Sequence, residues 1–285
     1  MNKQTKKYVL LENDTIEIEG HRLYRIKALK NFRTASETGT LDGLSISKNS
    51  LGGYIESEKN LSHKGKAWVG SNGKVYQDAV VSDNAYVDYA EIFGRAKIYG
   101  EAYVNGSHYD TNSVHIFANA DICDAMVTGN SYIYGNAKLS GFLWVLDSQI
   151  FDDAYIYCNK ETTDFFIRKS TVFGRATICG NIYRGYIANV ENACIGGNAL
   201  IRHSNDYLVI TANMDTARET TFFRTKSGVG VLSDQYIDKN GKVEKLPILS
   251  IEDFLQYIKL EYSKDIEFWQ LITEAAKLRI QKEHG

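Results

Sequence analysis

Histidine is the residue type of this chain best suited to proton transfer near neutral pH, because its imidazole changes charge there. The sequence has six histidines, and His108 and His115 lie in one short stretch with an irregular pattern. Asp110 is close to His108, but no histidine has a carboxylate partner at a recognisable fixed spacing. Two hypotheses stay open for these two histidines: a general base of an enzyme, or ordinary histidines of exposed loops.

Other catalytic and ligand-binding motifs are absent. The chain has no phosphate-binding G-x-x-x-x-G-K-[ST] loop, no G-x-G-x-x-G after a strand, no H-E-x-x-H and no G-x-S-x-G. The four cysteines form no C-x-x-C pair and no zinc-finger spacing, so we expect reduced thiols. The segment 238–241 superficially resembles a calcium loop, but Leu249 stands where the bidentate glutamate belongs. The sequence therefore predicts no metal and no cofactor.

Charge and hydropathy limit the partners. The 33 basic residues are balanced by 35 acidic ones, whereas proteins that bind long nucleic acids usually carry a basic excess for phosphate contacts. The N-terminal residues do not resemble a signal peptide, and no apolar run is long enough to span a membrane. We expect a cytoplasmic protein that binds neither long nucleic acid nor a membrane.

A six-residue repeat runs through residues 65–204. Each unit has a small residue, any residue and an aliphatic residue, followed by a Gly-, Asp- or Asn-containing turn, as at 96–98, 102–104 and 137–139. This period is neither that of a helix nor that of a simple strand. It fits a short strand and a tight turn, three times per coil, in a parallel β-helix with the aliphatic residues inside.

Turn glycines and the lack of proline support this fold. Glycine adopts a positive φ angle without a steric penalty, and we expect this conformation at Gly94, Gly100, Gly106, Gly129, Gly135, Gly174 and Gly180. The chain has one proline, Pro247. Proline would remove a hydrogen bond from an interior strand, so its scarcity suits a ladder of such strands.

The repeat resembles that of the left-handed β-helix hexapeptide-repeat family over about half of the chain. The resemblance implies a homo-oligomer, with a trimer packed along the prism faces as the favoured form. The commonest enzymes of the family are acyltransferases that bind acyl-coenzyme A, and under that hypothesis His108 or His115 would be the base. The family's carbonic anhydrases need two histidines separated by four residues on one coil, and this sequence has no such pair.

Two longer segments resemble a narrower group. The segment GGYIESEKNLS (52–62) precedes the repeats, and TTFFRTKSGVGV (220–231) follows them. Together with the Tyr-Gly and Asn-Ala hexads and two terminal helices, they are similar to uncharacterised hexapeptide-repeat proteins of bacteriophages and bacterial mobile elements. This resemblance implies architecture and origin, and no catalytic residue.

The pattern divides the chain into four parts: an N-terminal β cap (1–64), a left-handed β-helix (65–204), a β-hairpin module (205–248) and a two-helix module (249–285). The cap contains a hairpin around Gly20-His21, and the third part has hairpins at 220–232 and around Asn240-Gly241. Ser250 and Ser263 are the expected helix caps. The expected apolar faces are Phe254, Ile258 and Leu260 in the first helix, and Ile266, Trp269, Ile272, Ala276 and Ile280, widened by Phe268, Leu271 and Ala275, in the second.

Aromatic residues occupy outward positions of the repeat. Because coils recur at 17–18 residues, Trp68, Tyr86 and Tyr103 are expected to stack on one face, Tyr76 and Phe93 on the next, and Tyr99 to point outward as well. Exposed aromatic rows on a soluble protein usually mark an interaction surface. The alternative is cross-strand stacking that only stabilises the sheet.

The preferred hypothesis is a non-catalytic oligomeric binding or scaffold protein. The resemblance to phage proteins adds a role as an inhibitor of a bacterial immune system, which binds a host protein or sequesters a nucleotide signal. Two alternatives remain: an acyltransferase that uses His108 or His115, and a purely structural phage component.

Overall fold

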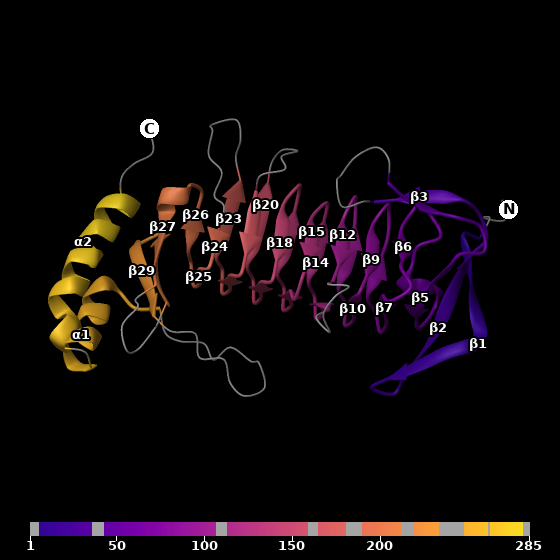
Figure 1. Cartoon of the computed structure of the whole chain (residues 1–285), viewed down its shortest axis with the longest axis horizontal. Coiled ribbons are helices and arrows are strands. Elements are labelled where there is room, and N and C mark those ends of the chain that lie inside the picture. Colours follow the sequence, from indigo (N-terminus) through magenta and orange to yellow (C-terminus); the bar gives the residue numbers. More distant parts are fainter. Residues whose placement is uncertain are drawn as a thin grey trace.

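The computed structural model describes residues 6–35, 43–106, 113–158, 165–180, 190–211, 219–233, 248–261 and 263–281. It shows an elongated parallel β-helix with an antiparallel hairpin at one end and two helices at the other (Figure 1). The predicted fold class, a β-helix with an N-terminal β segment and a C-terminal hairpin and helical module, is confirmed.

Three parallel sheets form the sides of the prism, and successive strands of the chain visit them in turn. Face I contains β5 (Leu51–Ile55), β7 (Lys74–Val75), β10 (Ala90–Ile92), β13 (Val114–Ile116), β16 (Tyr132–Ile133), β19 (Gln149–Ile150), β22 (Thr171–Val172) and β25 (Cys194–Ile195). Face II contains β8 (Val80–Val81), β11 (Lys97–Tyr99), β14 (Asp121–Cys123), β17 (Lys138–Ser140), β20 (Tyr155–Cys158), β23 (Thr177–Gly180) and β26 (Leu200–Ile201). Face III contains β6 (Trp68–Val69), β9 (Tyr86–Asp88), β12 (Tyr103–Asn105), β15 (Met126–Thr128), β18 (Trp144–Leu146), β21 (Phe166–Arg168) and β24 (Val190–Glu191).

The aliphatic residue of each repeat forms the core, as predicted. On face III, Val87, Val104 and Val127 are aligned in register on successive coils, and all three are buried. The small residues Ala102 and Ala137 are also fully buried. Each buried branched side chain contributes about 1.5–3 kcal/mol. The stack of coils therefore supplies one continuous core along the prism.

The turns at the corners agree with the prediction at most positions. Positive φ angles occur at five of the predicted glycines, namely Gly94, Gly100, Gly129, Gly135 and Gly174. The prediction is wrong for Gly106 and Gly180, which do not have a positive φ. At Gly106 the reason for glycine is space, because a Cβ atom would lie 2.2 Å from the carbonyl oxygen of Tyr89. Close backbone approach and left-handed geometry thus select the same residue type.

The N-terminal segment covers the first coils. β1 (Tyr8–Ile18) and β2 (His21–Ala28) form the predicted hairpin, and β3 (Phe32–Thr34) pairs with β4 (Leu44–Ile46). β2 pairs with β5 in antiparallel fashion, and β5 pairs with β7 in parallel. The parallel pairing of face I therefore starts at β5, which is followed by the 3₁₀ turn η1 (Glu58–Asn60).

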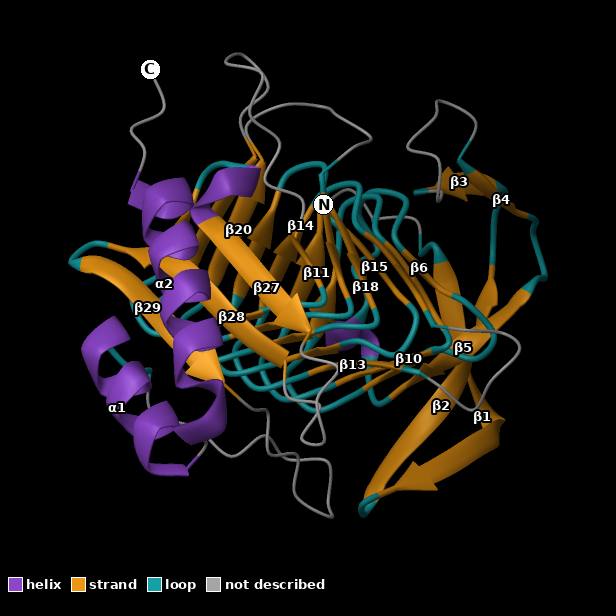
Figure 2. Ribbon diagram, turned by 60° about the vertical axis from the view of Figure 1, so that its left-hand side comes forward, coloured by secondary structure: helices purple, strands orange, loops and turns teal. Residues whose placement is uncertain are grey.

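A three-stranded antiparallel sheet covers the other end. It consists of β27 (Tyr207–Thr211), β28 (Glu219–Thr225) and β29 (Gly228–Ser233), and the β28–β29 hairpin is the one predicted at 220–232. Phe223 and Leu232 join the core of the β-helix, whereas Phe222 and Val231 pack in the cluster that contains the helices. The sheet thus separates the β-helix from the helices (Figure 2). The turn predicted at Asn240-Gly241 lies outside the described residues.

The helices are α1 (Ile251–Glu261) and α2 (Ile266–Gln281), with the 3₁₀ turns η3 (Ser204–Asp206) and η4 (Ser263–Asp265) before β27 and α2. Ser250 caps α1 as predicted, since its Oγ accepts a hydrogen bond of 3.1 Å from the backbone N–H of Asp253. Ser263 instead begins η4.

The apolar faces predicted for the helices are confirmed in part. Phe254, Ile258, Trp269, Ala276 and Ile280 are buried. Leu260, Phe268, Leu271 and Ala275, which were assigned to the same apolar faces, are exposed in the single chain. The sheet covers only one side of α2, so the second stripe of this helix has no cover among the described residues.

Candidate functional site

An apolar row follows the outer surface of face III. Strand pairing places one residue per coil side by side, in the order Trp68, Tyr86, Tyr103, Met126, Trp144 and Phe166. Each precedes an inward aliphatic residue such as Val104 or Val145, so its side chain points away from the core. The first three members of this row were predicted from the sequence pattern. Met126, Trp144 and Phe166 were not predicted, although their positions before Val127, Val145 and Ile167 carry the same signal.

Trp68 and Tyr86 point outward but are buried, so the prediction that they are exposed is wrong. Phe32 of the N-terminal segment packs edge-on against Trp68, with ring centroids 5.5 Å apart. Tyr86 stacks on Tyr103 at 5.4 Å, and its hydroxyl donates a hydrogen bond of 2.9 Å to Asp88. Burial and the Asp88 carboxylate raise the pKa of Tyr86 above its usual range. These two rings are therefore part of the folded structure.

The other four members form what we call the face III stripe: Tyr103, Met126, Trp144 and Phe166. Tyr103, Met126 and Phe166 are half-buried, and Trp144 is 39% exposed. The indole N–H of Trp144 donates a hydrogen bond of 2.8 Å to Thr128 Oγ1 on the neighbouring coil. This bond fixes one edge of the ring on the sheet. The stripe is thus an ordered apolar surface on a rigid support.

Tyr76 and Phe93 belong to a different row, which the sequence indicated only at its beginning. Stacked rings continue from them along the corner between faces I and II, with centroid separations of 5.3, 4.9, 4.9, 4.9 and 5.4 Å. The rings of this column are Tyr76, Phe93, Phe117, Tyr134, Phe151 and Phe173. The prediction that Tyr76 is exposed is wrong, because it is buried beside His21, while Phe93 is half-buried. The predicted stacking of these two rings is confirmed.

Tyr99 lies on face II, next to Cys123 and Asp121 of the following coil. It is half-buried, and burial followed by its hydrogen bond to Asp121 raises the pKa of its hydroxyl. Burial also raises the pKa of the Cys123 thiol to about 12, with a further contribution from Asp124. A thiol with this pKa carries little thiolate near neutral pH, so Cys123 is a poor nucleophile.

His115 lies in the regular strand β13, and not in an irregular loop as the sequence suggested. It is half-buried, stacks on Tyr132 at 4.8 Å, and its Nε2 lies 2.9 Å from Ser113 Oγ. Glu91 is its neighbour in register, but this carboxylate accepts a hydrogen bond of 2.7 Å from Tyr76. Burial lowers the pKa of His115, against the raising effect of Glu91. At neutral pH the imidazole is therefore uncharged, and no carboxylate of the described chain is hydrogen-bonded to it.

The other histidines give no catalytic arrangement. His108 and its neighbour Asp110 lie outside the described residues, as does His284. His203 Nδ1 accepts a hydrogen bond of 3.0 Å from the backbone N–H of Asn205 in the turn η3. His21 lies 3.0 Å from Glu56 within the N-terminal segment. The histidines that the structure describes thus serve turns and packing.

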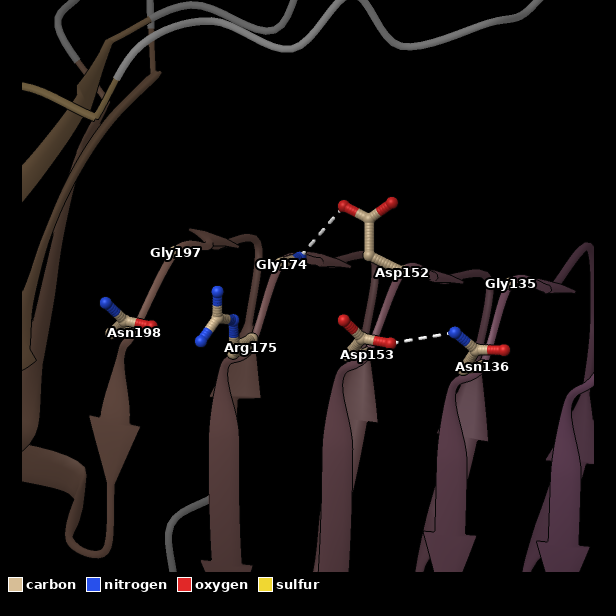
Figure 3. Close-up of a pocket in the computed structure, with 8 residues that line it drawn as sticks. All are labelled: Gly135, Asn136, Asp152, Asp153, Gly174, Arg175, Gly197 and Asn198. Atoms are coloured by element: carbon tan, nitrogen blue, oxygen red, sulfur yellow. Dashed lines mark hydrogen bonds between the residues drawn. The ribbon is translucent and has the colours of Figure 1, made fainter.

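A polar row follows the corner between faces I and II. Figure 3 shows Asn136, Asp153, Arg175 and Asn198 side by side on successive coils, along an open depression of about 520 Å³. Asn136 donates a hydrogen bond of 2.8 Å to Asp153, and Asp152 accepts one of 3.1 Å from the backbone N–H of Gly174. The two carboxylates thus hold neighbouring coils together. The row offers hydrogen bonds to a polar ligand but no pairing of nucleophile and base.

Neither protein-family models nor curated protein sequences match this chain. Within the described ranges, no group of three or more His, Cys, Asp or Glu residues could hold a metal ion. No helix in the same ranges is long and apolar enough to cross a membrane.

Proposed function

We propose that the protein is a non-catalytic, oligomeric binding scaffold in which face III is the contact surface. The observation that carries this proposal is the face III stripe, in which large apolar side chains occupy the outward position of consecutive coils. The corresponding positions of the other faces are mostly polar. They hold Lys74, Glu91, His115, Tyr132, Gln149, Thr171 and Cys194 on face I, and Val80, Lys97, Asp121, Lys138, Tyr155, Thr177 and Leu200 on face II.

The residue types of the stripe favour binding to a protein surface. Tryptophan, tyrosine, phenylalanine and methionine are enriched in the centres of protein interfaces. The hydrogen bond from Trp144 to Thr128 orients the indole before any partner arrives, so little side-chain entropy is lost on binding. Met126 lies between Tyr103 and Trp144 and can adapt its shape to a partner.

Another copy of the chain is the partner that we propose for this face. The resemblance to hexapeptide-repeat proteins supports a trimer whose prisms lie side by side around a common axis. A flat sheet face suits this packing, because the strands keep their outward side chains in one plane. Assembly would give a rigid body with three equivalent sets of the remaining surfaces for binding a further molecule.

Replacement of Trp144 by glutamate tests the proposal. A charge on the stripe should abolish side-by-side packing and reduce the mass of the assembly to one third, as measured by sedimentation velocity at a fixed concentration. Tyr155→Glu is the matched control, because Tyr155 is also 39% exposed and aromatic but lies on face II. It should leave the mass unchanged.

If the mass of the assembly falls in both variants, or in neither, face III is not the contact surface. Circular dichroism verifies that both variants remain folded. Tyr86→Glu is unsuitable for this test. Tyr86 is buried and bonded to Asp88, so its replacement would disturb the coil itself.

We extend the proposal to origin and role: a phage- or mobile-element-encoded protein that inhibits a bacterial immune system by binding a host protein or sequestering a nucleotide signal. Only the resemblance of segments 52–62 and 220–231 supports this extension. Co-purification from bacterial lysate followed by mass spectrometry tests it. Recovery of neither a host protein nor a nucleotide would favour the structural phage component instead.

A further inference from the structure

The outer side of helix α2 carries two of the three most exposed large apolar residues of the described chain. Leu271 is 74% exposed and Leu278 is 77% exposed, and Leu260 at the end of α1 is 74% exposed. The opposite side of α2 is buried through Trp269, Thr273, Ala276 and Ile280. Figure 1 shows α2 at the end of the molecule, on the side of the sheet away from the β-helix. The helix therefore has a second apolar side that its own chain leaves open.

The spacing on this open side is that of a helix-pairing seam. Phe268, Leu271, Ala275 and Leu278 follow one another at intervals of 3, 4 and 3 residues, and all four are exposed. A strict 3-4 alternation is the a/d pattern of a two-helix coiled coil, whereas a surface helix of a globular protein normally has one wider apolar stripe and a polar opposite side. We call these four residues the α2 seam.

We propose that the α2 seam binds the α2 seam of a second copy of the chain, with the two helices parallel about a two-fold axis. Charge supports this partner and this direction. In a parallel pair, a residue on one flank of the seam meets the residue five positions later on the other flank of the partner helix. Glu274 and Arg279 are separated by five positions and flank the seam. In the single chain, Glu274 lies 3.1 Å from Lys277 and Arg279 donates a hydrogen bond to the carbonyl oxygen of Ser204. Pairing of two copies would exchange these exposed contacts for an ion pair between Glu274 and Arg279 of different copies. The two-fold axis would form this ion pair twice.

An antiparallel pair would bring the same flank of both helices together. Glu267 and Glu274 occupy one flank of the seam, so antiparallel packing would set like charges beside each other. The parallel arrangement avoids this repulsion. In it, Ala275 leaves room for the partner helix to approach closely.

Pairing through this seam needs no prior folding step. Residues on the buried side of α2 already pack in one cluster with Phe222 and Val231 of the terminal sheet, so the helix exists before the partner binds. An isolated helix would first have to form its costly first turn. Because α2 lies at the end of the molecule, the pair joins two β-helices end to end and leaves face III free. The inference is thus independent of the proposed function.

Leu271→Asp tests the seam in the full-length protein. A charge at its centre should halve the mass of the assembly in sedimentation velocity, whatever happens at face III. Gln270→Asp adds the same charge at an adjacent exposed position outside the seam and should leave the mass unchanged. Trp144→Glu should retain the end-to-end pair, so failure of one interface can be told from failure of the other. An unchanged mass for Leu271→Asp would overturn the inference.

Charge reversal tests the parallel direction. Glu274→Arg should weaken the pair at least tenfold, because it sets two arginines against each other across the seam. Adding Arg279→Glu to this variant should restore the pair. Weakening without restoration, or no weakening at all, would overturn the parallel arrangement. Both variants change exposed residues, and thermal unfolding verifies that the fold is retained.

Discussion

The Asp206→Ala variant is expected to lose about 3–5 kcal/mol of unfolding free energy, the range for breaking a buried ion pair. Asp206 is buried in the turn η3 between the last coil and the terminal sheet. One carboxylate oxygen accepts a bond of 2.5 Å from Arg224 Nε, and the other accepts bonds of 2.8 Å from the backbone N–H groups of Arg202 and His203. Alanine removes the carboxylate from the half-buried Arg224 cation and takes the acceptor from two backbone amides.

Replacement of Asp206 should also weaken the packing of the helices, because Arg224 donates a hydrogen bond to the carbonyl oxygen of Ile280 in α2. Urea unfolding followed by circular dichroism measures the effect. Asp78→Ala is the control, since Asp78 forms a comparable pair with Lys59 at 3.0 Å but with both side chains mostly exposed. That variant should lose less than about 1 kcal/mol. Equal losses in the two variants would contradict the structural role of Asp206.

Phe151→Ala should lower the free energy of unfolding by a similar amount, about 3–5 kcal/mol, because it leaves a cavity in the aromatic column. The Phe151 ring is buried between Tyr134 at 4.9 Å and Phe173 at 5.4 Å. Neighbouring coils contact each other directly, so a cavity in the middle of the stack weakens the coils on both sides. Thermal or urea unfolding measures the loss.

Tyr155→Ala provides the comparison for this variant. Tyr155 stacks on one aromatic neighbour, Tyr157 of the same strand, and is 39% exposed on face II. Its removal should lower the free energy of unfolding by less than about 1 kcal/mol, the size of the contacts that an outward strand residue makes with its cross-strand neighbours, here Lys138 and Thr177. If Phe151→Ala were no more destabilising than Tyr155→Ala, the column would not contribute to the stability of the β-helix.

The inside of the β-helix follows from local pattern. A six-residue period specifies the strand, the turn and the inward residue of every repeat, so Val87, Val104 and Val127 could be assigned to the core without a structure. The period also indicates which residues point outward. It placed Tyr86 beside Tyr103 and Tyr76 beside Phe93, as the ring stacking shows.

Exposure on the outside could not be predicted in the same way. Trp68 and Tyr76 are covered by Phe32 and His21, which belong to a segment far earlier in the chain with a different pattern. No repeat relates that segment to the coils it covers. Direction relative to the core is a local property of a strand, whereas burial depends on every segment that packs against it.

The C-terminal helices illustrate the same limit. The sequence of α2 carries two apolar stripes, one through Trp269 and Ile280 and one through Leu271 and Leu278. Periodicity alone gives no reason to bury one stripe and expose the other. The terminal sheet makes this choice, because only one side of the helix can face Phe222 and Val231.

Acrylamide quenching of Trp144 is the most direct test of face III as the contact surface. The chain has three tryptophans, of which Trp68 and Trp269 are buried and Trp144 is exposed in the single chain. Comparison with Trp144→Phe isolates the emission of this one residue. Our account predicts that Trp144 is shielded from acrylamide in the assembled protein and becomes quenchable when dilution separates the chains. Equal quenching of Trp144 in assembled and separated chains would contradict it.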